Sequence, residues 1–229
     1  MNDIKFSLFE GRTFLIVSQQ QLKVLSSAVL GGGLRRVRFI INHTVDRNYY
    51  GKLTPAKYLS HMARKMNLGS DTVGLMTAVD VKRTVMSFGT RDDVAVAALS
   101  TVGVGNACSA GAKNAFFKGE DRPGTINIVV LIDGDLTDAA MVNAVITATE
   151  AKSMAMMHAD IRLPDGTVAT GTTTDAIVIA CTAKGRLHHY SGMATDLGFL
   201  VGRAVYKAVA EGISNSCAYE GSYGCVKLN

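Results

Sequence analysis

Three stretches of the sequence are apolar at almost every position, and only one kind of strand permits that. They are residues 94–102, 126–132 and 177–180. A strand with one face in water alternates apolar and polar residues, whereas a strand covered on both faces is apolar throughout. We therefore expect three central strands with protein on each side. Material for these layers is present, because 48% of the residues are hydrophobic and only 19% are charged.

Three segments have the apolar spacing of helices. Residues 54–67 start with Thr54-Pro55, a pair that suits a helix cap and a first helical position, and they end before Gly69. Apolar residues recur at intervals of three and four over residues 136–157 and 193–213. Each of these helices would cover part of a sheet with its apolar side.

Shorter strands are predicted where β-rich residues adjoin turn residues, and they cover residues 4–9, 13–17, 37–42, 72–81 and 84–88. The first two flank Glu10-Gly11-Arg12 and predict an amino-terminal hairpin. The last two flank Lys82-Arg83 and predict a hairpin or a bulged strand. Hairpin neighbours favour antiparallel pairing.

Together these elements predict an α+β fold, in which a mixed, mostly antiparallel sheet or pair of sheets is layered with helices. No linker or repeat divides the chain, so residues 1–229 are predicted to form a single domain. Residues 215–229 are rich in Gly, Ser and Tyr and are predicted to be a tail.

The charge and the amino-terminal sequence indicate which partners and which cellular location to expect. The net charge is +5, but the basic residues do not cluster, aromatic residues make up 7% and Trp is absent. These features argue against nucleic-acid binding, which usually needs a basic face and stacking aromatics. The amino terminus lacks the pattern of a signal peptide, and no window of about 18 residues is uninterruptedly apolar. We expect a cytoplasmic protein without a membrane or nucleic-acid partner.

Polar residues interrupt the apolar pattern at the ends of the predicted elements. The candidate binding residues at these places are Gly32, Gly33, Asn42, Asn106, Asn127, Thr172, Thr173 and Thr174. Glycine N–H groups, amides and hydroxyls can all hold a polar ligand. The two glycines are equally consistent with a plain turn. No Walker A loop, GxSxG elbow or HExxH motif is present, so no metal or cofactor is predicted from a motif.

Four residues are candidates for acid–base chemistry: His43, Glu150, Lys152 and Asp175. Glu150 lies in a helix of small apolar residues and is either buried with a raised pKa or an ordinary solvated carboxylate. Asp175 precedes a buried strand and is either a structural cap or a site residue. His43 follows Asn42 in a polar break and titrates near neutral pH. Cys108 and Cys181 have small or apolar neighbours and are interpreted as buried thiols.

Eight segments, in order over residues 25–210, resemble the adenosylcobinamide amidohydrolase family, CbiZ. They are LSSAVLGGG (25–33), INHTVDRNY (41–49), VGLMTAV (73–79), STVGVGNA (100–107), GTINIVVLID (124–133), ATEAKSMAM (148–156), ATGTTTDAIVIA (169–180) and YSGMATDLGFLVGRAVYKAV (190–209). The resemblance implies hydrolysis of the amide that joins aminopropanol to the corrin ring, giving adenosylcobyric acid and 1-amino-2-propanol in corrinoid salvage. The corrinoid would be the substrate, with no cofactor named.

The resemblance assigns no catalytic residues, and two mechanisms stay open. Either Glu150 or Asp175 activates a water, or a threonine of 172–174 attacks with help from Lys152, Asp175 or His43. Asn and glycine N–H groups would stabilise the oxyanion. The alternative function is a corrinoid carrier or sensor without catalysis. Small residues of the last predicted helix would pack against a second copy, giving a homo-oligomer, or against the chain's own sheet; they are Gly198, Gly202, Ala204 and Ala208.

Overall fold

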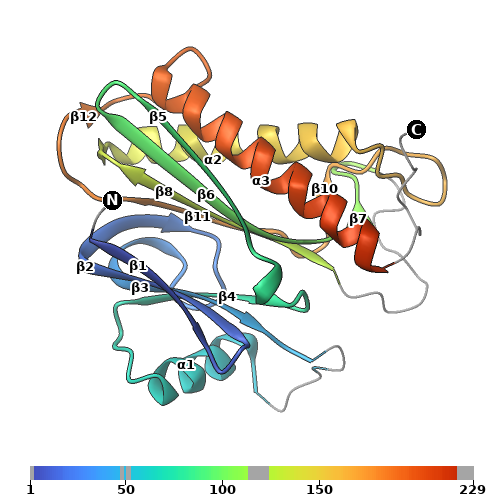
Figure 1. The fold of residues 1–229 in the computed structure, drawn as a ribbon, viewed down its shortest axis with the longest axis horizontal. Coiled ribbons are helices and arrows are strands. Elements are labelled where there is room, and N and C mark those ends of the chain that lie inside the picture. Colours follow the sequence, from blue (N-terminus) through green and yellow to red (C-terminus); the bar gives the residue numbers. More distant parts are fainter. Residues whose placement is uncertain (1–2, 47–48, 50–52, 113–123, 221–229) are drawn as a thin grey trace.

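The computed structural model describes residues 3–46, 49, 53–112 and 124–220 (Figure 1). Its helices are α1 (Pro55–Lys65), α2 (Asp138–His158) and α3 (Asp196–Glu220), with a short 3-10 turn η1 (Val81–Arg83). Its strands are β1 (Ile4–Phe9), β2 (Thr13–Ser26), β3 (Gly33–Thr44), β4 (Thr72–Thr77), β5 (Val85–Arg91), β6 (Val94–Gly103), β7 (Ala107–Cys108), β8 (Thr125–Asp133), β9 (Asp135–Leu136), β10 (Gly171–Thr172), β11 (Ala176–Cys181) and β12 (Leu187–His188).

One eight-stranded sheet organises the chain, in the order β4-β3-β2-β11-β8-β6-β5, with β1 also paired to β2. The pairs β3–β4 and β8–β11 are parallel, and the other five pairings in this sheet are antiparallel. Two short sheets, β7–β10 and β9–β12, lie beside it. The predicted α+β class with a mixed, mostly antiparallel sheet and covering helices is therefore confirmed.

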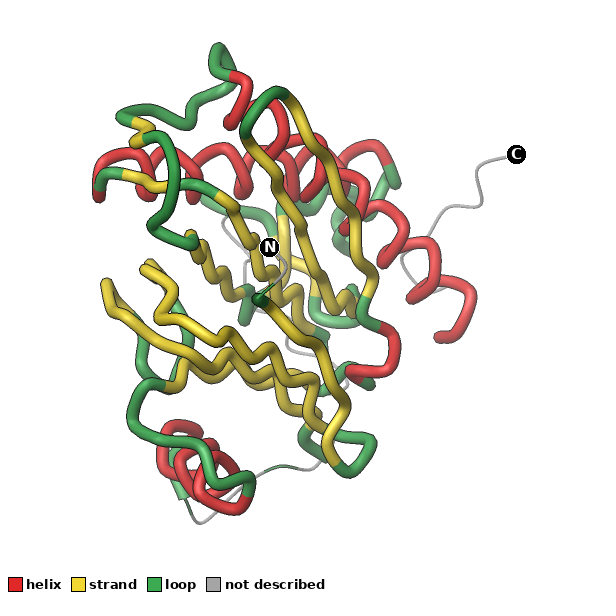
Figure 2. Tube along the Cα trace, turned by 60° about the vertical axis from the view of Figure 1, so that its left-hand side comes forward, coloured by secondary structure: helices red, strands yellow, loops and turns green. Residues whose placement is uncertain are grey.

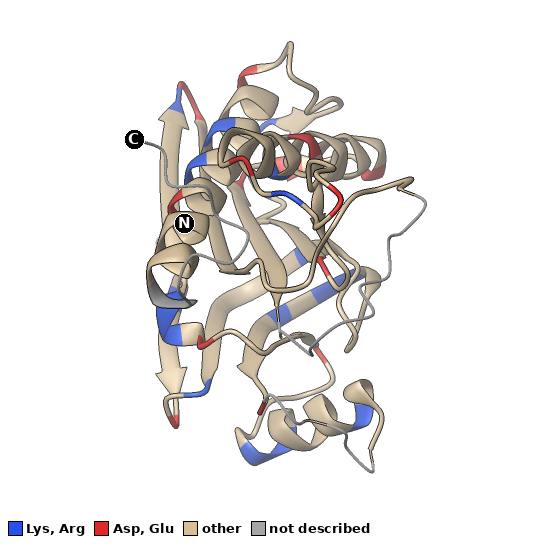
Figure 3. Cartoon of the chain, turned by 90° about the vertical axis from the view of Figure 1, so that its right-hand side faces the viewer, with Lys and Arg blue, Asp and Glu red and all other residues tan. Residues whose placement is uncertain are grey.

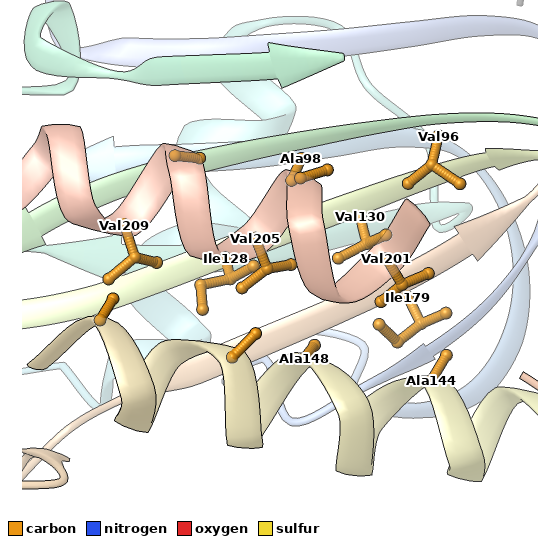
Figure 4. Packing of buried hydrophobic residues seen from close by; sticks show 14 of the residues in the cluster. Val96, Ala98, Ile128, Val130, Ala144, Ala148, Ile179, Val201, Val205 and Val209 are labelled. Atoms are coloured by element: carbon orange, nitrogen blue, oxygen red, sulfur yellow. The ribbon is translucent and has the colours of Figure 1, made fainter. Parts of the chain in front are cut away.

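The three apolar strands, β6, β8 and β11, are covered on both faces, as predicted. Alternate residues such as Val96, Ile128 and Val130 form one core with α2 and α3. Figure 4 shows how closely the valines of α3 and the alanines of α2 approach these strands. The intervening residues, such as Leu99 and Val129, form a second core with β2, β3 and β4. The sheet must therefore bend so that its amino-terminal half lies across its other half, as Figure 2 shows.

Helix α1 covers the outer side of this amino-terminal half. Thr54 caps the helix by accepting a hydrogen bond from the Lys57 backbone N–H, and Pro55 occupies the first turn, as the sequence predicts. Leu59 and Ala63 are the buried residues of this helix. The helix thereby leaves the inner side of β3 and β4 to the second core.

The predicted pairing of residues 72–81 with 84–88 is wrong. These residues form β4 and β5, which lie at opposite edges of the sheet. Between them Asp80 caps η1, because its side chain accepts a hydrogen bond from the Lys82 N–H. The bend of the sheet lets this short connection join the two edges, and β5 pairs instead with β6.

The last helix is longer than predicted. It starts three residues later than expected and continues to Glu220, so the part of the predicted tail over 215–220 is helical. Ser and Asn have modest helix propensity, but Ile213 and Cys217 pack against the core beneath α3, which favours the helix here. Residues 221–229 lie outside the described part of the chain.

The small residues of α3 pack within the chain. Ala204 and Ala208 are buried in the core beneath the helix. A side chain at Gly198 would collide with the backbone of Gly192, and one at Gly202 would press on Met193. These residues therefore allow α3 to lie close to its own neighbours, which is the second of the two predicted roles.

Figure 3 shows Lys and Arg together with Asp and Glu on helices, strands and loops of both halves of the molecule. Among the described residues, none of the helices combines the length and the apolarity that crossing a bilayer requires.

Candidate functional site

Most of the predicted polar residues gather at one end of the bent sheet. The carboxyl end of β6 pairs with the amino end of β8, because Thr101 lies opposite Asn127. The amino end of β11 adjoins the same place, since Ala176 lies opposite Asn127 on the other side. Residues that are distant in the sequence thus meet where these three strands start or end.

Asp175 organises the charged part of this end. Its Oδ1 accepts hydrogen bonds from the Thr172 hydroxyl at 2.5 Å, the Thr172 N–H at 3.1 Å and the Ile126 N–H at 3.3 Å. Its Oδ2 accepts from the Lys152 ammonium, which forms an ion pair with it. We call Lys152, Thr172 and Asp175 the Asp175 network. It joins α2, β10 and the start of β11 through one carboxylate.

Access to the Asp175 network is restricted but not closed. The side chains of Lys152 and Asp175 are 12% and 20% exposed. At this exposure the ion pair is shielded from much of the solvent but is still partly accessible. The network can therefore supply an ammonium donor and a carboxylate acceptor to a bound molecule.

Gly171 makes the Lys152–Asp175 ion pair sterically feasible. A Cβ at this position would lie 2.5 Å from Lys152 Nζ and closer still to Asp175 Oδ2. A side chain at this position would therefore force at least one of the two charged groups to shift. Gly171 lies opposite Cys108 in the β7–β10 pair, which places the thiol beside the ion pair.

Cys108 is a site neighbour that sequence reasoning missed. It was predicted to be buried like Cys181, but it is only partly buried, whereas Cys181 is fully buried. Burial raises the pKa of the Cys108 thiol, the Asp175 carboxylate adds to this, and the Lys152 ammonium opposes it. Its position two residues after Asn106, in a polar break, was the available signal.

Hydroxyls and an amide hold the neighbouring loops together. Asn106 Nδ2 donates to the Thr173 hydroxyl oxygen at 2.7 Å, and the Thr173 N–H donates to the Asn106 carbonyl at 3.3 Å. The hydroxyl oxygens of Thr125 and Thr174 lie 2.5 Å apart. Thr173 and Thr174 are exposed, whereas Thr172 is 6% exposed. The three threonines therefore have different surroundings, and two of them face solvent.

A second, neutral network lies on the sheet face toward β3 and β4. Asn127 Nδ2 donates to Asn42 Oδ1 at 2.9 Å and to the Met76 carbonyl at 3.0 Å. Asn42 Nδ2 in turn donates to the Thr101 hydroxyl oxygen at 3.0 Å. We call Asn42, Thr101 and Asn127 the Asn127 network. All three side chains are buried, so this network joins the two halves of the sheet.

His43 lies on the opposite face of β3 from Asn42, as alternate strand residues must. Its Nδ1 lies 2.7 Å from the Thr13 hydroxyl, and its Nε2 lies 3.2 Å from the Tyr58 hydroxyl of α1. Burial, followed by the Arg12 guanidinium, lowers the pKa of His43. The structure therefore does not bring His43 together with the other candidate residues.

Three further candidates also lie apart from these networks. Glu150 is exposed on α2, which makes it the solvated carboxylate of the two predicted alternatives. Gly32 lies in the turn that precedes β3, and Gly33 is the first residue of that strand. A Cβ at Gly32 would lie 2.5 Å from the Ala28 carbonyl oxygen, and Gly33 has a φ of +91°. The turn alone accounts for both glycines.

Within the described residues, no three side chains of His, Cys, Asp or Glu come together as metal ligands. Lys152, Asp175 and the threonines form a polar set of a different kind, suited to hydrogen bonds with a neutral polar ligand. The carboxylate can accept a proton, the ammonium can stabilise negative charge, and the exposed hydroxyls can bind amides.

Comparison with known proteins identifies relatives along nearly the whole chain. The family model described as adenosylcobinamide amidohydrolase matches residues 2–221. A protein of that name from Methanosarcina mazei is 31% identical over 196 residues, covering 82% of this chain and 88% of the relative. One from Halobacterium salinarum is 40% identical over 87 residues, covering 38% and 35% of the two chains.

A solved structure from Pyrococcus horikoshii, the PH0078 protein, covers 90% of this chain and 77% of its own, with 10% identity and a TM-score of 0.45. That likeness is too distant to inform the site. The sequence relatives are sufficient to assign the family, because one family model spans both halves of the sheet and all three helices. The chain belongs to the adenosylcobinamide amidohydrolase family.

Proposed function

We propose that this chain hydrolyses the amide bond that joins aminopropanol to a corrin side chain of adenosylcobinamide. The products would be adenosylcobyric acid and 1-amino-2-propanol, so the bond broken is a linear amide outside any peptide. The match of the family model over residues 2–221 carries this proposal. The polar end of the sheet supports it, because it gathers the kinds of groups that amide hydrolysis uses.

Amide hydrolysis needs a nucleophile, a stabilised oxyanion and a proton for the leaving amine. In our proposal, water attacks the amide carbonyl carbon and gives a proton to Asp175. The Lys152 ammonium lies beside the oxyanion and stabilises it. The carbon–nitrogen bond then breaks, and the proton passes to the departing aminopropanol nitrogen. Asn106, Thr173 and Thr174 would bind the carboxamides at the corrin edge.

The arrangement around Asp175 favours water over Thr172 as the nucleophile. The Thr172 hydroxyl already donates to Asp175, so a base is in place for it. However, Thr172 is 6% exposed, and its N–H also contacts the carboxylate, so the residue forms a closed turn. A water that replaces the hydroxyl at Asp175 Oδ1 would have easier access to a substrate. The variant Thr172→Val distinguishes the two mechanisms, because valine has no hydroxyl that could act as the nucleophile.

The decisive experiment is to incubate the purified chain with adenosylcobinamide, with and without a chelator, and to follow the corrinoid by mass spectrometry. We expect the corrinoid to lose aminopropanol and free amine to accumulate over many turnovers. An unchanged corrinoid mass with a stoichiometric shift in absorbance would contradict the proposal and indicate a corrinoid carrier or sensor. The chelator arm reports whether the reaction depends on a metal.

A further inference from the structure

The side-chain oxygen of Asn127 has an unusual environment. It is buried, and among the described residues it has no hydrogen-bond partner. The orientation of this amide is fixed by its nitrogen, because Nδ2 donates to two oxygens, Asn42 Oδ1 and the Met76 carbonyl. In the flipped orientation, an oxygen would face these two acceptors. Buried polar atoms without a partner are rare and costly, so an additional donor is expected beside this oxygen.

A small cavity lies at the same place. Its volume is about 10 Å³, and it is lined by the Asn127 network and by apolar residues that include Ile40, Leu99 and Val129. Thr84 and Ser100 also line it, but their hydroxyls donate to backbone carbonyls. This volume is close to the smallest that holds one water molecule. A substrate carboxamide is too large for it.

The Thr101 hydroxyl supplies the second partner that a water needs. Its oxygen accepts from Asn42 Nδ2, and within the described chain its own hydrogen has no acceptor. Thr101 and Asn127 are directly opposite each other in the β6–β8 pair. Side chains in such a pair start about 5 Å apart, a span that one water can bridge with two hydrogen bonds.

We propose that the cavity binds a single internal water molecule, which donates to Asn127 Oδ1 and accepts from the Thr101 hydroxyl. The water completes the Asn127 network and so joins β6 and β8 beneath β3 and β4. It is a built-in part of the fold rather than a reactant, and the proposal does not depend on the reaction proposed above.

The first test is a crystal structure of the full chain at a resolution that shows ordered water. We expect one isolated density peak within hydrogen-bond distance of Asn127 Oδ1 and of Thr101 Oγ1. An empty cavity, or a protein donor in contact with Asn127 Oδ1, would overturn the proposal.

The second test compares Thr101→Val with Thr101→Ser. Valine keeps the shape but removes the hydroxyl, so the water should be lost and the Tm should fall by roughly 5 °C. Serine keeps the hydroxyl and should keep the water peak, with a smaller change in Tm. Retention of the peak and of the Tm in Thr101→Val would contradict the proposed role of the hydroxyl. If Thr101→Val does not fold, the crystal structures of the wild type and of Thr101→Ser still decide.

Discussion

The Asp175 network and the Asn127 network lie at the same end of the sheet but differ in charge and in access. The first contains an ion pair that is 12–20% exposed, and Asp175 accepts hydrogen bonds with both oxygens. The second is neutral and buried, and the described residues leave one acceptor, Asn127 Oδ1, without a partner.

This difference suits the first network to a role in the reaction and the second to a role in stability. Proton transfer to a substrate needs ionisable groups that a ligand can reach, whereas a neutral, hydrogen-bonded network can be buried between two layers at little cost. Changes in the Asp175 network should therefore affect the rate more than the stability. Changes in the Asn127 network should do the reverse.

The largest effect is expected from Asp175→Asn. This change keeps the shape of the side chain but removes the base and the counter-ion of Lys152, so kcat should fall about 10²–10⁴-fold. Release of 1-amino-2-propanol measures the rate, and circular dichroism checks the fold. Asp165→Asn, in an exposed turn, is the matched control and should be close to wild type. A near-normal rate for Asp175→Asn would remove Asp175 from the reaction.

Gly171→Ala tests the same network without changing a charged group. The added methyl would collide with Lys152 Nζ and Asp175 Oδ2, so the ion pair should separate and kcat should fall about 10²-fold. Gly192→Ala is the matched control, because a Cβ there meets nothing within 4 Å. Equal activity of both variants would show that the ion pair tolerates displacement.

Asn127→Leu should lower the stability of the protein more than it lowers the rate of the reaction. It leaves Asn42 Oδ1 and the Met76 carbonyl without their donor, so the free energy of unfolding should fall by about 1–3 kcal/mol. Urea denaturation measures it, with the slope of the transition as a check on two-state behaviour. The folded protein should lose less than about tenfold in rate. A rate loss like that of Asp175→Asn would instead place Asn127 in the reaction centre.

The smallest effect concerns His43, which belongs to neither network. Its pKa is lowered in the folded protein, mainly by burial, so the unfolded chain binds the proton more readily. Stability should therefore be full above about pH 6.5 and decline as the pH falls below that value. The Tm of the wild type should drop more between about pH 7.5 and 5.5 than that of His43→Gln. Identical pH profiles would contradict the assignment.

The sequence predicted the central strands and helices well, because apolar spacing reports directly on burial. Residues 94–102, 126–132 and 177–180 are indeed covered on both faces. What covers each face was beyond the sequence, since helices and strands present the same apolar surface to a neighbour. The β4–β5 pairing failed for a related reason: closeness along the chain favours a hairpin, whereas the bend of the sheet separates the two strands.

The candidate site was predicted in its parts but not in its grouping. Asp175 and Lys152 are 23 residues apart, and the absence of a side chain at Gly171 leaves room for them to meet as they do. Asn42 and His43 were considered together because they are adjacent, yet alternation along β3 sends them to opposite faces. Cys108 was missed because its small neighbours suggested burial.

The place of β2 in the sheet has a consequence for synthesis. Ser27, just after β2, and Ile177 in β11 are in contact although 150 residues separate them. A ribosome adds about 5–20 residues per second, so Lys23–Ser26, the part of β2 that pairs with β11, waits about 8–30 s for its neighbour. During that time the backbone groups on one edge of this segment are unpaired, which makes it a place where newly made chains can associate with one another. We expect the nascent chain to need protection until β11 emerges.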